Sequence, residues 1–497
     1  MSKLEKILGI SFPDGIRISS ATNSTEKVKE DSIFFGLPGT KSHGSSYCEK
    51  ALKLGASLAV HNNPQEPFKS DKVFFIKDLL EDSLDEGKIF YFLEEFYKFY
   101  SFHQNKFFTF TGTNGKTSSA YLCHQLLINK DCDSIYVGTL GTQLNNRNFN
   151  TSFSSKTTPD IFELFEILNF YKDYISDSIN ICIEISSHAL DQKRLKDING
   201  LHSAALLNIT SDHLDYHKNF DSYRDSKFEI FRMNSSIKII DEALIIYKDN
   251  FGFIKDYQND LISISSINTF SDIFYKIEEQ SLEKSIFTIY INNPPNAYPN
   301  ESKRNYRFLC KLFPEFNIHN LVFAICSIGF DAFSEEIIND LSFLTLPKGR
   351  TELIKDIPRN IIIDYAHNEK AMDYFLSQIK SYFDDVIVVF GCGGDRDKSK
   401  RSLMLKAALM YSSSVIFTSD NCRNERFEDI FIDASKNNSL DNVIKIKDRK
   451  KAIKHGVSLL DKNKCMIIFG KGHEETQEEN GKLSFFSDHE VVNEIYK

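Results

Sequence analysis

The chain has 497 residues, of which 41% are hydrophobic and 26% charged, and its formal net charge is -9. A chain of this length exceeds one ordinary core, so we expect two to four domains with enough apolar surface to fill each. The negative charge leaves no broad basic face, which excludes nucleic acid as an expected partner.

The nine cysteines are scattered, and none forms a C-x-x-C pair. They indicate neither a zinc site nor a disulfide framework, and they fit a reducing cytoplasm. Residues 1–6 lack the apolar core of a signal peptide, and no stretch approaches the apolar length of a membrane span. We therefore expect a cytoplasmic protein without a membrane span.

The first hundred residues end in a polar, aromatic segment of helical character, residues 85–102. The motif Gly-Thr-Asn-Gly-Lys-Thr at 112–117 follows an apolar run at 107–110 and precedes a helix-like run at 118–128. Strand, glycine loop and helix together cradle the phosphates of a nucleotide, because backbone N–H groups and the helix N-terminus face the phosphate oxygens. Lys116 can reach the terminal phosphates, and the Thr117 hydroxyl can ligate Mg²⁺.

This loop is two residues shorter than the usual phosphate loop, and Phe110 stands where the longer pattern has its first glycine. A glycine-rich turn with a chance Lys-Thr is the alternative interpretation. The flanking strand and helix patterns favour a nucleotide-binding enzyme.

Acidic and histidine residues follow in the central region. Residues 180–185 predict a strand with Glu184 near its end, and a carboxylate there is the usual second ligand of a nucleotide's Mg²⁺. Residues 212–217 hold two His and two Asp in six positions, which favours a metal or substrate role for His213. The alternatives are a strand-end Glu that faces water and a solvated loop.

The last third of the chain alternates strands and helices. Residues 292–306 are rich in Pro and Asn and indicate a surface loop, residues 317–330 return to helical periodicity, and residues 347–350 resemble a linker. From residue 360 the pattern predicts strands at 360–364, 386–390, 415–417 and 465–469 and helices at 371–383 and 402–411. Such alternation predicts a mostly parallel sheet, with ligands at the carboxyl ends of its strands. The polar residues at those ends are Asp364, His367, Arg396, Asp420, Asn421, Arg423, Lys471, His473 and Glu474.

At four blocks the chain resembles the Mur ligases, ATP-dependent amide-forming enzymes of bacterial cell-wall synthesis. The blocks are 112–117, 184–188, 208–213 and 364–367, and their order and spacing match along nearly the whole chain. Three further blocks, 390–397, 420–423 and 470–474, are similar to one type within the family. That type adds the third residue, a diamino acid, to UDP-N-acetylmuramoyl-L-alanyl-D-glutamate.

The resemblance implies an α/β fold of three domains. These are a small N-terminal UDP-muramoyl-binding domain (1–103), a central ATP-binding domain with a P-loop ATPase-like parallel sheet (104–346), and a Rossmann-like amino-acid-binding domain (347–497). It also implies that ATP converts the substrate carboxylate to an acyl phosphate, which an amine then attacks. Mg²⁺ is the implied cofactor, the substrates are small molecules, and a monomer is expected.

The resemblance assigns roles by position. Catalytic roles fall to Lys116, Glu184, His213 and Lys227. The implied metal ligands are Thr117, Glu184, His213 and Lys227, the last as a carbamate that turns a cation into an anion. The implied ATP contacts are Gly112, Thr113, Asn114, Gly115, Lys116, Thr117, Ser118, Asn317, Asn320, Arg350 and Asp364. The implied contacts to the UDP-muramoyl dipeptide are Ser24, Thr157, Thr158, Ser186, Gln192 and Arg194.

Several positions depart from the family pattern. Lys156 stands where the type has Asn, Pro314-Glu315 replaces Gly-Ala, and Cys422 replaces a Pro. Asn23-Ser24-Thr25 replaces Asp-Ser-Arg, which leaves the uridine contacts open except at Ser24.

The residue added is either meso-diaminopimelate or lysine. Diaminopimelate carries an extra carboxylate at its far end, and arginine suits it because the guanidinium offers two parallel N–H donors. The block 420–423, Asp-Asn-Cys-Arg, resembles the diaminopimelate-specific version. The implied amino-acid contacts are Arg396, Asp420, Asn421, Cys422, Arg423, Gly470 and Glu474.

Three alternatives remain at this stage. In the first alternative, Arg423 is a plain surface residue near Glu425 and Arg426, and lysine is the amino acid added. A second alternative is another amide ligase of the family, such as the one that adds D-Ala-D-Ala, or folylpolyglutamate synthase. The third is a catalytically silent nucleotide-binding regulator on the same fold.

Overall fold

The structure is a computed structural model that describes residues 1–39, 42–66, 70–80, 87–99, 105–147, 157–175, 178–196, 198, 200–250, 261–292, 304–331 and 333–497. Contacts group the chain into two compact units. The first unit holds Met1–Thr111, Leu127–Ala205 and Ser226–Lys238. The second holds Gly112–Leu126, Leu206–Asp225 and Ile239–Lys497.

The N-terminal part of the first unit is a parallel sheet with the strand order β1 (Ser20–Thr22), β2 (Ser32–Gly36), β3 (Ala56–His61) and β4 (Val73–Phe75). Phe34, Cys48 and Ala59 belong to its core. Its helices and 3₁₀ turns are α1 (Lys3–Leu8), η1 (Thr25–Lys27), η2 (Gly44–Tyr47), α2 (Cys48–Lys53) and α3 (Lys88–Tyr97). Helix α3 confirms the described part of the helix expected at 85–102, whose two ends lie outside the described residues.

One end of a second, longer sheet has the order β9 (Leu201–Leu206), β5 (Lys106–Thr111), β8 (Asn180–Glu184), β6 (Ser134–Gly138) and β7 (Gly141–Leu144). Strands β5 and β6 both run parallel to β8, whereas β7 returns antiparallel to β6. Residues of β5 and β8 are buried almost without interruption, as in strands covered on both faces. The helices and 3₁₀ turns here are α5 (Ile161–Tyr171), η4 (Lys172–Tyr174), α6 (Ser187–Asp191) and η5 (Glu229–Arg232).

The second unit contains a run of strands that the sequence analysis does not predict. Its order is β15 (Asn339–Asp340), β14 (Arg304–Cys310), β13 (Ser285–Ile291), β12 (Ile273–Gln280) and β11 (Leu261–Ser265). Strands β12, β13 and β14 are antiparallel, and β14 alternates buried with more exposed residues, as an antiparallel strand with one covered face does. The neighbouring helices are α7 (Leu214–His217), η6 (Glu242–Asn250) and α10 (Glu315–Ile328). The elements α4 (Lys116–Ile128), α8 (Phe220–Phe228), β9 and β10 (Ser235–Asp241) continue from one unit into the other.

The C-terminal part of the second unit confirms the predicted α/β alternation. Its sheet has the order β16 (Glu352–Leu353), β17 (Asn360–Asp364), β21 (Lys464–Phe469), β18 (Asp385–Phe390), β19 (Ser414–Phe417) and β20 (Val443–Lys445). All neighbours are parallel except β16 and β17. The other elements are α11 (Glu369–Ile379), η7 (Lys380–Tyr382), α12 (Ser399–Tyr411), α13 (Phe427–Ser435), α14 (Arg449–Ser458), the hairpin β22 (Thr476–Glu479) and β23 (Lys482–Phe485), and α15 (Asp488–Tyr496).

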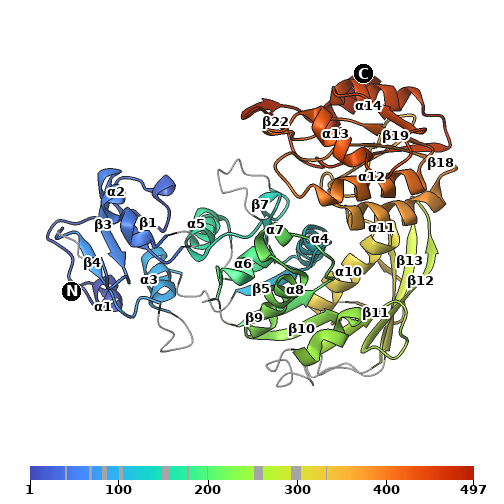
Figure 1. The fold of residues 1–497 in the computed structure, drawn as a ribbon. Coiled ribbons are helices and arrows are strands. Elements are labelled where there is room, and N and C mark those ends of the chain that lie inside the picture. The colour runs from blue at the N-terminus through green and yellow to red at the C-terminus, as the bar shows by residue number, and fades with distance from the viewer. Residues whose placement is uncertain are drawn as a thin grey trace. The chain divides into compact units, whose positions relative to one another are not determined.

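Helices pack against this C-terminal sheet and form two separate hydrophobic cores with it (Figure 1). One core packs α11, α12 and α13 on the sheet, and the other packs α14 and α15. The polar residues singled out in the sequence follow the carboxyl ends of the parallel strands β17, β18, β19 and β21.

The predicted α/β class with parallel sheets is confirmed. Each large sheet falls within one of the three predicted domain ranges, but the contact-based units divide the chain differently, so the boundaries stay a prediction. Residues 103 and 104 lie outside the described part. In the part of the chain that the structure describes, no helix has both the length and the apolar character needed to cross a membrane.

Candidate active site

The glycine loop lies between β5 and α4, as the sequence predicts. Gly115 has φ +87°, which side chains rarely adopt, and a Cβ built there would overlap the Asn320 side chain. Glycine is therefore required at this turn, where the loop meets the N-terminus of α4, the end of a helix that attracts an oxyanion. Thr117 and Ser118, at the start of α4, are both buried.

Asn208 holds the loop in this shape. Its side chain accepts from Asn114 N (2.9 Å) and donates to Asn114 O (3.0 Å), and its carbonyl accepts from Thr113 N (2.9 Å). The Thr113 hydroxyl in turn lies 2.9 Å from the Tyr223 hydroxyl. The sequence analysis places Asn208 in a family block but assigns it no role, because 94 positions separate it from the loop.

Lys116 folds back over the loop. Its ammonium donates to the carbonyl oxygens of Gly112 (2.8 Å) and Thr113 (2.9 Å). These carbonyls keep the ammonium beside the loop, where a phosphate oxygen would replace them as the acceptor.

Residues after the linker reach the same loop within the second unit. Arg350 Nη2 lies 3.4 Å from Thr117 Oγ1, and the guanidinium stacks 4.3 Å above the Tyr365 ring. The Asp364 carboxylate accepts from Thr351 N (2.6 Å) and Ala366 N (2.8 Å), and burial raises its pKa although Arg350 opposes the shift. Asp364 therefore shapes the turn that carries Arg350.

Asn317 and Asn320 lie on one buried face of α10. Asn317 Nδ2 donates to Phe313 O (2.8 Å) and Thr351 Oγ1 (3.1 Å), and Asn320 donates to Asn317 Oδ1 (3.3 Å). Gly115 packs against Asn320. The ATP residues predicted in the second unit are thus joined in one network of contacts around the loop.

His213 stands at the start of α7 with φ +51° and a half-exposed side chain. Its backbone N–H donates to Asp212 Oδ1 (3.0 Å), and Lys400 Nζ lies 3.8 Å from the same oxygen. Burial alone raises the pKa of Asp212, but His213, His367 and Lys400 together hold it below its ordinary value. Asp212 is therefore favoured as a carboxylate, with Lys400 and the His213 ring beside it.

Glu184 lies at the end of β8 in the first unit and is fully buried. Its carboxylate accepts hydrogen bonds from the Tyr136 hydroxyl, from Thr139 N (2.8 Å) and from Thr139 Oγ1 (3.1 Å). Neither Tyr136 nor Thr139 was singled out in the sequence. The three donors fix the orientation of a carboxylate that would otherwise be costly to bury.

The residues predicted to hold the muramoyl dipeptide come together beside β8, except for Ser24. Thr158 Oγ1 donates to Glu184 O (2.9 Å) and accepts from Ser186 N (2.9 Å). Arg194 donates to Thr158 O and Gln192 Oε1, both at 2.9 Å. Thr157 lies 3.3 Å from Thr139 Oγ1, whereas Ser24 caps η1 in the N-terminal sheet.

The implied metal ligands are divided between the units. Thr117 and His213 belong to the second unit, whereas Glu184 and Lys227 belong to the first, so their assembly into one site stays a prediction. Lys227 lies in α8 and is 1% exposed, unlike an ordinary surface lysine. Among the described residues, no group of three or more His, Cys, Asp or Glu is arranged to hold a metal. The Thr117 hydroxyl at the phosphate loop and the Glu184 carboxylate of the first unit are both hard oxygen donors, the kind that Mg²⁺ prefers.

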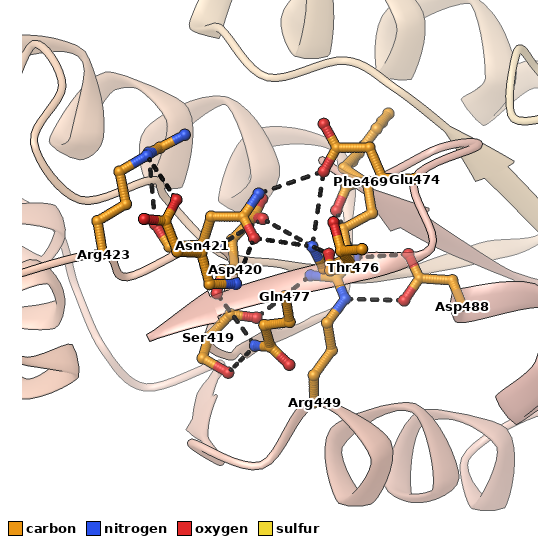
Figure 2. Close-up of polar contacts among 12 residues, drawn as sticks. Ser419, Asp420, Asn421, Arg423, Arg449, Phe469, Glu474, Thr476, Gln477 and Asp488 are labelled. Atoms are coloured by element: carbon orange, nitrogen blue, oxygen red, sulfur yellow. Dashed lines mark hydrogen bonds and ion pairs between the residues drawn. The ribbon is translucent and has the colours of Figure 1, made fainter. Parts of the chain in front are cut away.

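Most of the predicted amino-acid contacts, Asp420, Asn421, Arg423 and Glu474 among them, lie where β19 and β21 end (Figure 2). Lys471, fully buried, lies at the centre: Nζ donates to Asn421 Oδ1 (3.2 Å) and Thr476 O (2.7 Å). The carboxylates of Asp420 and Glu474 lie 3.5 and 3.6 Å from the same ammonium. Asn421 also donates to Glu474 Oε2 (3.2 Å). The sequence analysis names Lys471 as a strand-end residue but gives it no role.

Close backbone packing completes this cluster. Gly470 has φ +110°, and a Cβ there would lie 2.5 Å from Asp420 Oδ2. Cys422 is buried, and its carbonyl packs on Gly394 so closely that a Cβ at that glycine would overlap it.

The two predicted arginines differ in their surroundings. Arg423 Nη1 donates to Gly394 O (2.7 Å), and Nε lies 3.5 Å from Glu478 Oε2. Arg423 is therefore held at the cluster, which argues against a plain surface residue. Arg396 is exposed in the loop after β18.

Known proteins match the chain along nearly its whole length. Residues 110–328 match the Mur ligase middle domain, and residues 349–472 match the Mur ligase glutamate ligase domain. A UDP-N-acetylmuramoyl-L-alanyl-D-glutamate--2,6-diaminopimelate ligase of Wigglesworthia glossinidia brevipalpis is 33% identical, over 97% of this chain and 95% of the relative. A protein of that name from Clostridium perfringens (strain 13 / Type A) is 30% identical, over 96% and 95%.

The fold agrees with these sequence matches. A solved structure of a protein with the same ligase name has a TM-score of 0.65 at 26% identity, over 99% of this chain and 98% of that one. The chain belongs to the Mur ligase family.

Proposed function

We propose that this chain is an ATP-dependent ligase that joins meso-diaminopimelate to UDP-N-acetylmuramoyl-L-alanyl-D-glutamate during peptidoglycan precursor synthesis. One observation carries the proposal: Asp420, Asn421 and Glu474 meet around the buried Lys471, and Arg423 Nη1 lies 3.5 Å from Asn421 O. The full-length relatives of the chain bear that ligase name. A nucleotide loop and an amino-acid cluster on one chain fit a ligase better than a regulator.

In the proposed reaction, the substrate carboxylate attacks the γ-phosphate of ATP and gives an acyl phosphate. The amine of the amino acid then displaces phosphate through a tetrahedral intermediate. Phosphorylation is needed because a carboxylate is a poor electrophile and oxide is a poor leaving group.

The residues supply the charge that this chemistry needs. The N-terminus of α4 would attract the phosphate oxygens, and Lys116 would exchange its loop carbonyls for phosphate. Bound Mg²⁺ would neutralise the crowded phosphate charge, held by Thr117, Glu184, His213 and the carbamate of Lys227. Lys227 is buried rather than on the helix surface, as a lysine that serves as a metal ligand would be. Thr157, Thr158, Ser186, Gln192, Arg194 and Ser24 would orient the muramoyl dipeptide.

The side chains of the amino-acid cluster match the charged groups of diaminopimelate. Arg423 provides a guanidinium for the distal carboxylate of diaminopimelate, with Nη1 already anchored on Gly394 O. Asp420, Asn421 and Glu474 offer oxygen acceptors for ammonium groups, and Gly470 and Cys422 shape the surrounding loops. Arg396, which is exposed in the loop after β18, would contribute a second positive charge.

The proposal is tested by phosphate release from the purified chain, with each substrate omitted in turn. We expect release only when UDP-muramoyl dipeptide, ATP and diaminopimelate are all present, with L-lysine much poorer. Equal use of lysine would move the assignment to the lysine-adding type. Release without an amino acid would contradict the ligase.

A variant pair tests the role of Arg423. Arg423→Ala should raise the KM for diaminopimelate far more than the KM for ATP, because only the amino acid meets this guanidinium. Arg426→Ala is the matched control, since Arg426 is mostly exposed and pairs with Asp429. Equal effects of the two substitutions would remove Arg423 from the site.

We infer further that the chain acts as a monomer in the cytoplasm on small-molecule substrates. All nine cysteines are free thiols, and all but Cys132 are buried, which supports a reducing compartment. Light scattering coupled to gel filtration tests the monomer.

A further inference from the structure

Glu478 lies beside Arg423 and was not predicted as a site residue. Its backbone N–H donates to Asn421 Oδ1 (2.9 Å), and its carbonyl accepts from Arg423 N (3.1 Å). These contacts fix β22 against the loop that follows β19. The position of the Glu478 carboxylate is therefore set by the same backbone that positions Arg423.

Glu478 and Arg423 form a pair of opposite charges that is partly exposed to solvent. Glu478 Oε2 lies 3.5 Å from Arg423 Nε, and the two side chains are 35% and 23% exposed. The guanidinium is anchored at Nη1 by Gly394 O (2.7 Å). Within the described part of the chain, nothing accepts from Nη2, so this edge remains for an incoming carboxylate.

The other carboxylates of the cluster already face a cation. Asp420 and Glu474 lie 3.5 and 3.6 Å from the ammonium of Lys471. Glu478 is instead matched to Arg423, the residue that would bind the distal carboxylate of the amino acid. The distal end of diaminopimelate bears an ammonium and a carboxylate on one carbon. These two charges are complementary to those of Glu478 and Arg423.

We propose that Glu478 is a specificity-determining residue that binds the distal ammonium of the diamino acid, while Arg423 binds the carboxylate on the same carbon. This inference rests on the proposed ligase function. In the free enzyme the two side chains pair with each other, and the zwitterionic end of the substrate replaces that contact with two new ones. A lysine side chain, which lacks the carboxylate, would leave Arg423 without its new partner.

The test compares two substrates on two enzymes. meso-Diaminopimelate and 2-aminopimelate share the reacting amine and the distal carboxylate, but 2-aminopimelate lacks the distal ammonium. The wild type should prefer diaminopimelate in kcat/KM by about tenfold, the size expected of one charge-assisted contact. Glu478→Gln should reduce that preference to within about twofold and leave the KM for ATP unchanged, because it removes only the charge.

Glu479→Gln is the matched control. Glu479 is the next residue of β22, and its carboxylate pairs with Lys447 at 2.8 Å rather than with Arg423. It makes the same change of charge and should keep the wild-type preference. Glu478→Asp retains the charge and should keep more of the preference than Glu478→Gln; thermal unfolding of each variant shows that the fold is intact.

The outcomes separate the two claims. If the wild type turns over diaminopimelate but Glu478→Gln keeps the tenfold preference, the inference fails and the proposed function stands. If Glu478→Gln binds diaminopimelate more tightly, Glu478 only competes with the substrate for Arg423, which also overturns the inference. If the wild type uses neither substrate, the proposed function fails and the inference falls with it.

Discussion

Arg449 and Asp488 form a bidentate ion pair in which neither side chain has any exposed surface. Nε lies 2.8 Å from Oδ1 and Nη2 lies 2.7 Å from Oδ2. Nη2 also donates to Phe469 O (2.9 Å), the last residue of β21 (Figure 2). The pair therefore holds the strand end from which Gly470 and Lys471 enter the amino-acid cluster.

Asp488→Asn should destabilise the C-terminal part of the second unit, because it leaves the guanidinium of Arg449 buried without its counter-charge. We expect a loss of about 3–5 kcal/mol in unfolding free energy, measured by urea denaturation. The control is Glu494→Gln, which breaks the exposed pair of Lys450 and Glu494 between the same two helices, α14 and α15. Equal shifts in the two variants would contradict the importance of the buried pair.

Gly115→Ala should abolish tight ATP binding. The new Cβ would overlap Asn320 and distort the loop, and φ +87° adds backbone strain. Gly141→Ala is the control, because Gly141 has φ +86° but nothing within 4 Å of an added Cβ. Calorimetry should find at least a tenfold weaker Kd for ATP in the first variant, about 1.4 kcal/mol, and little change in the second. Similar losses in both would assign the effect to strain alone.

Lys471→Met should impair amino-acid use selectively. Without the buried ammonium, the carboxylates of Asp420 and Glu474 repel each other and Asn421 loses a donor. The KM for diaminopimelate should rise more than tenfold, a loss above about 1.4 kcal/mol, while the KM for ATP changes little. Lys482→Met, at an exposed residue of β23, is the control. A parallel rise of both KM values would indicate general unfolding.

Much of the C-terminal fold is predictable because its parallel strands are continuous apolar runs. Residues 360–364 and 465–469 match β17 and β21 closely. The helix expected at 371–383 is α11, which ends at Ile379 before a 3₁₀ turn. Strands β12 to β14 were not predicted, since their alternation of buried and exposed residues is a weaker signal than an apolar run.

The site residues were predictable where polar or charged side chains directly follow a predicted strand in the sequence. Asp420, Asn421, Arg423 and Glu474 lie in motifs, and the structure brings them together. Asn208 contacts Asn114, and Glu478, on the hairpin strand β22, contacts Arg423. Both partners are distant in the chain, so no local sequence pattern marks either residue. The Arg449–Asp488 pair spans 39 positions, so only tertiary structure reveals it.

Acid should weaken the contacts of Glu425 in a defined pH window. Hydrogen bonds from Arg401 lower the pKa of Glu425 from 4.5 to about 2, so the folded state holds the carboxylate ionised. A lowered folded-state pKa contributes stability above the unfolded pKa and loses it as the pH falls through the folded value. The stability difference between wild type and Glu425→Gln should therefore be largest above about pH 5 and shrink toward pH 2. A difference that does not change with pH, in denaturation curves across this range, would contradict the assignment.

The mass of the reaction product tests the central claim most directly. The purified chain is incubated with ATP, Mg²⁺, UDP-N-acetylmuramoyl-L-alanyl-D-glutamate and an equimolar mixture of meso-diaminopimelate and L-lysine, and the UDP-linked products are measured by mass spectrometry. We predict one product, heavier than the substrate by one diaminopimelate less one water, formed with an equal amount of ADP. A product that carries lysine in equal yield, or ADP formed without any UDP-linked product, would contradict the account.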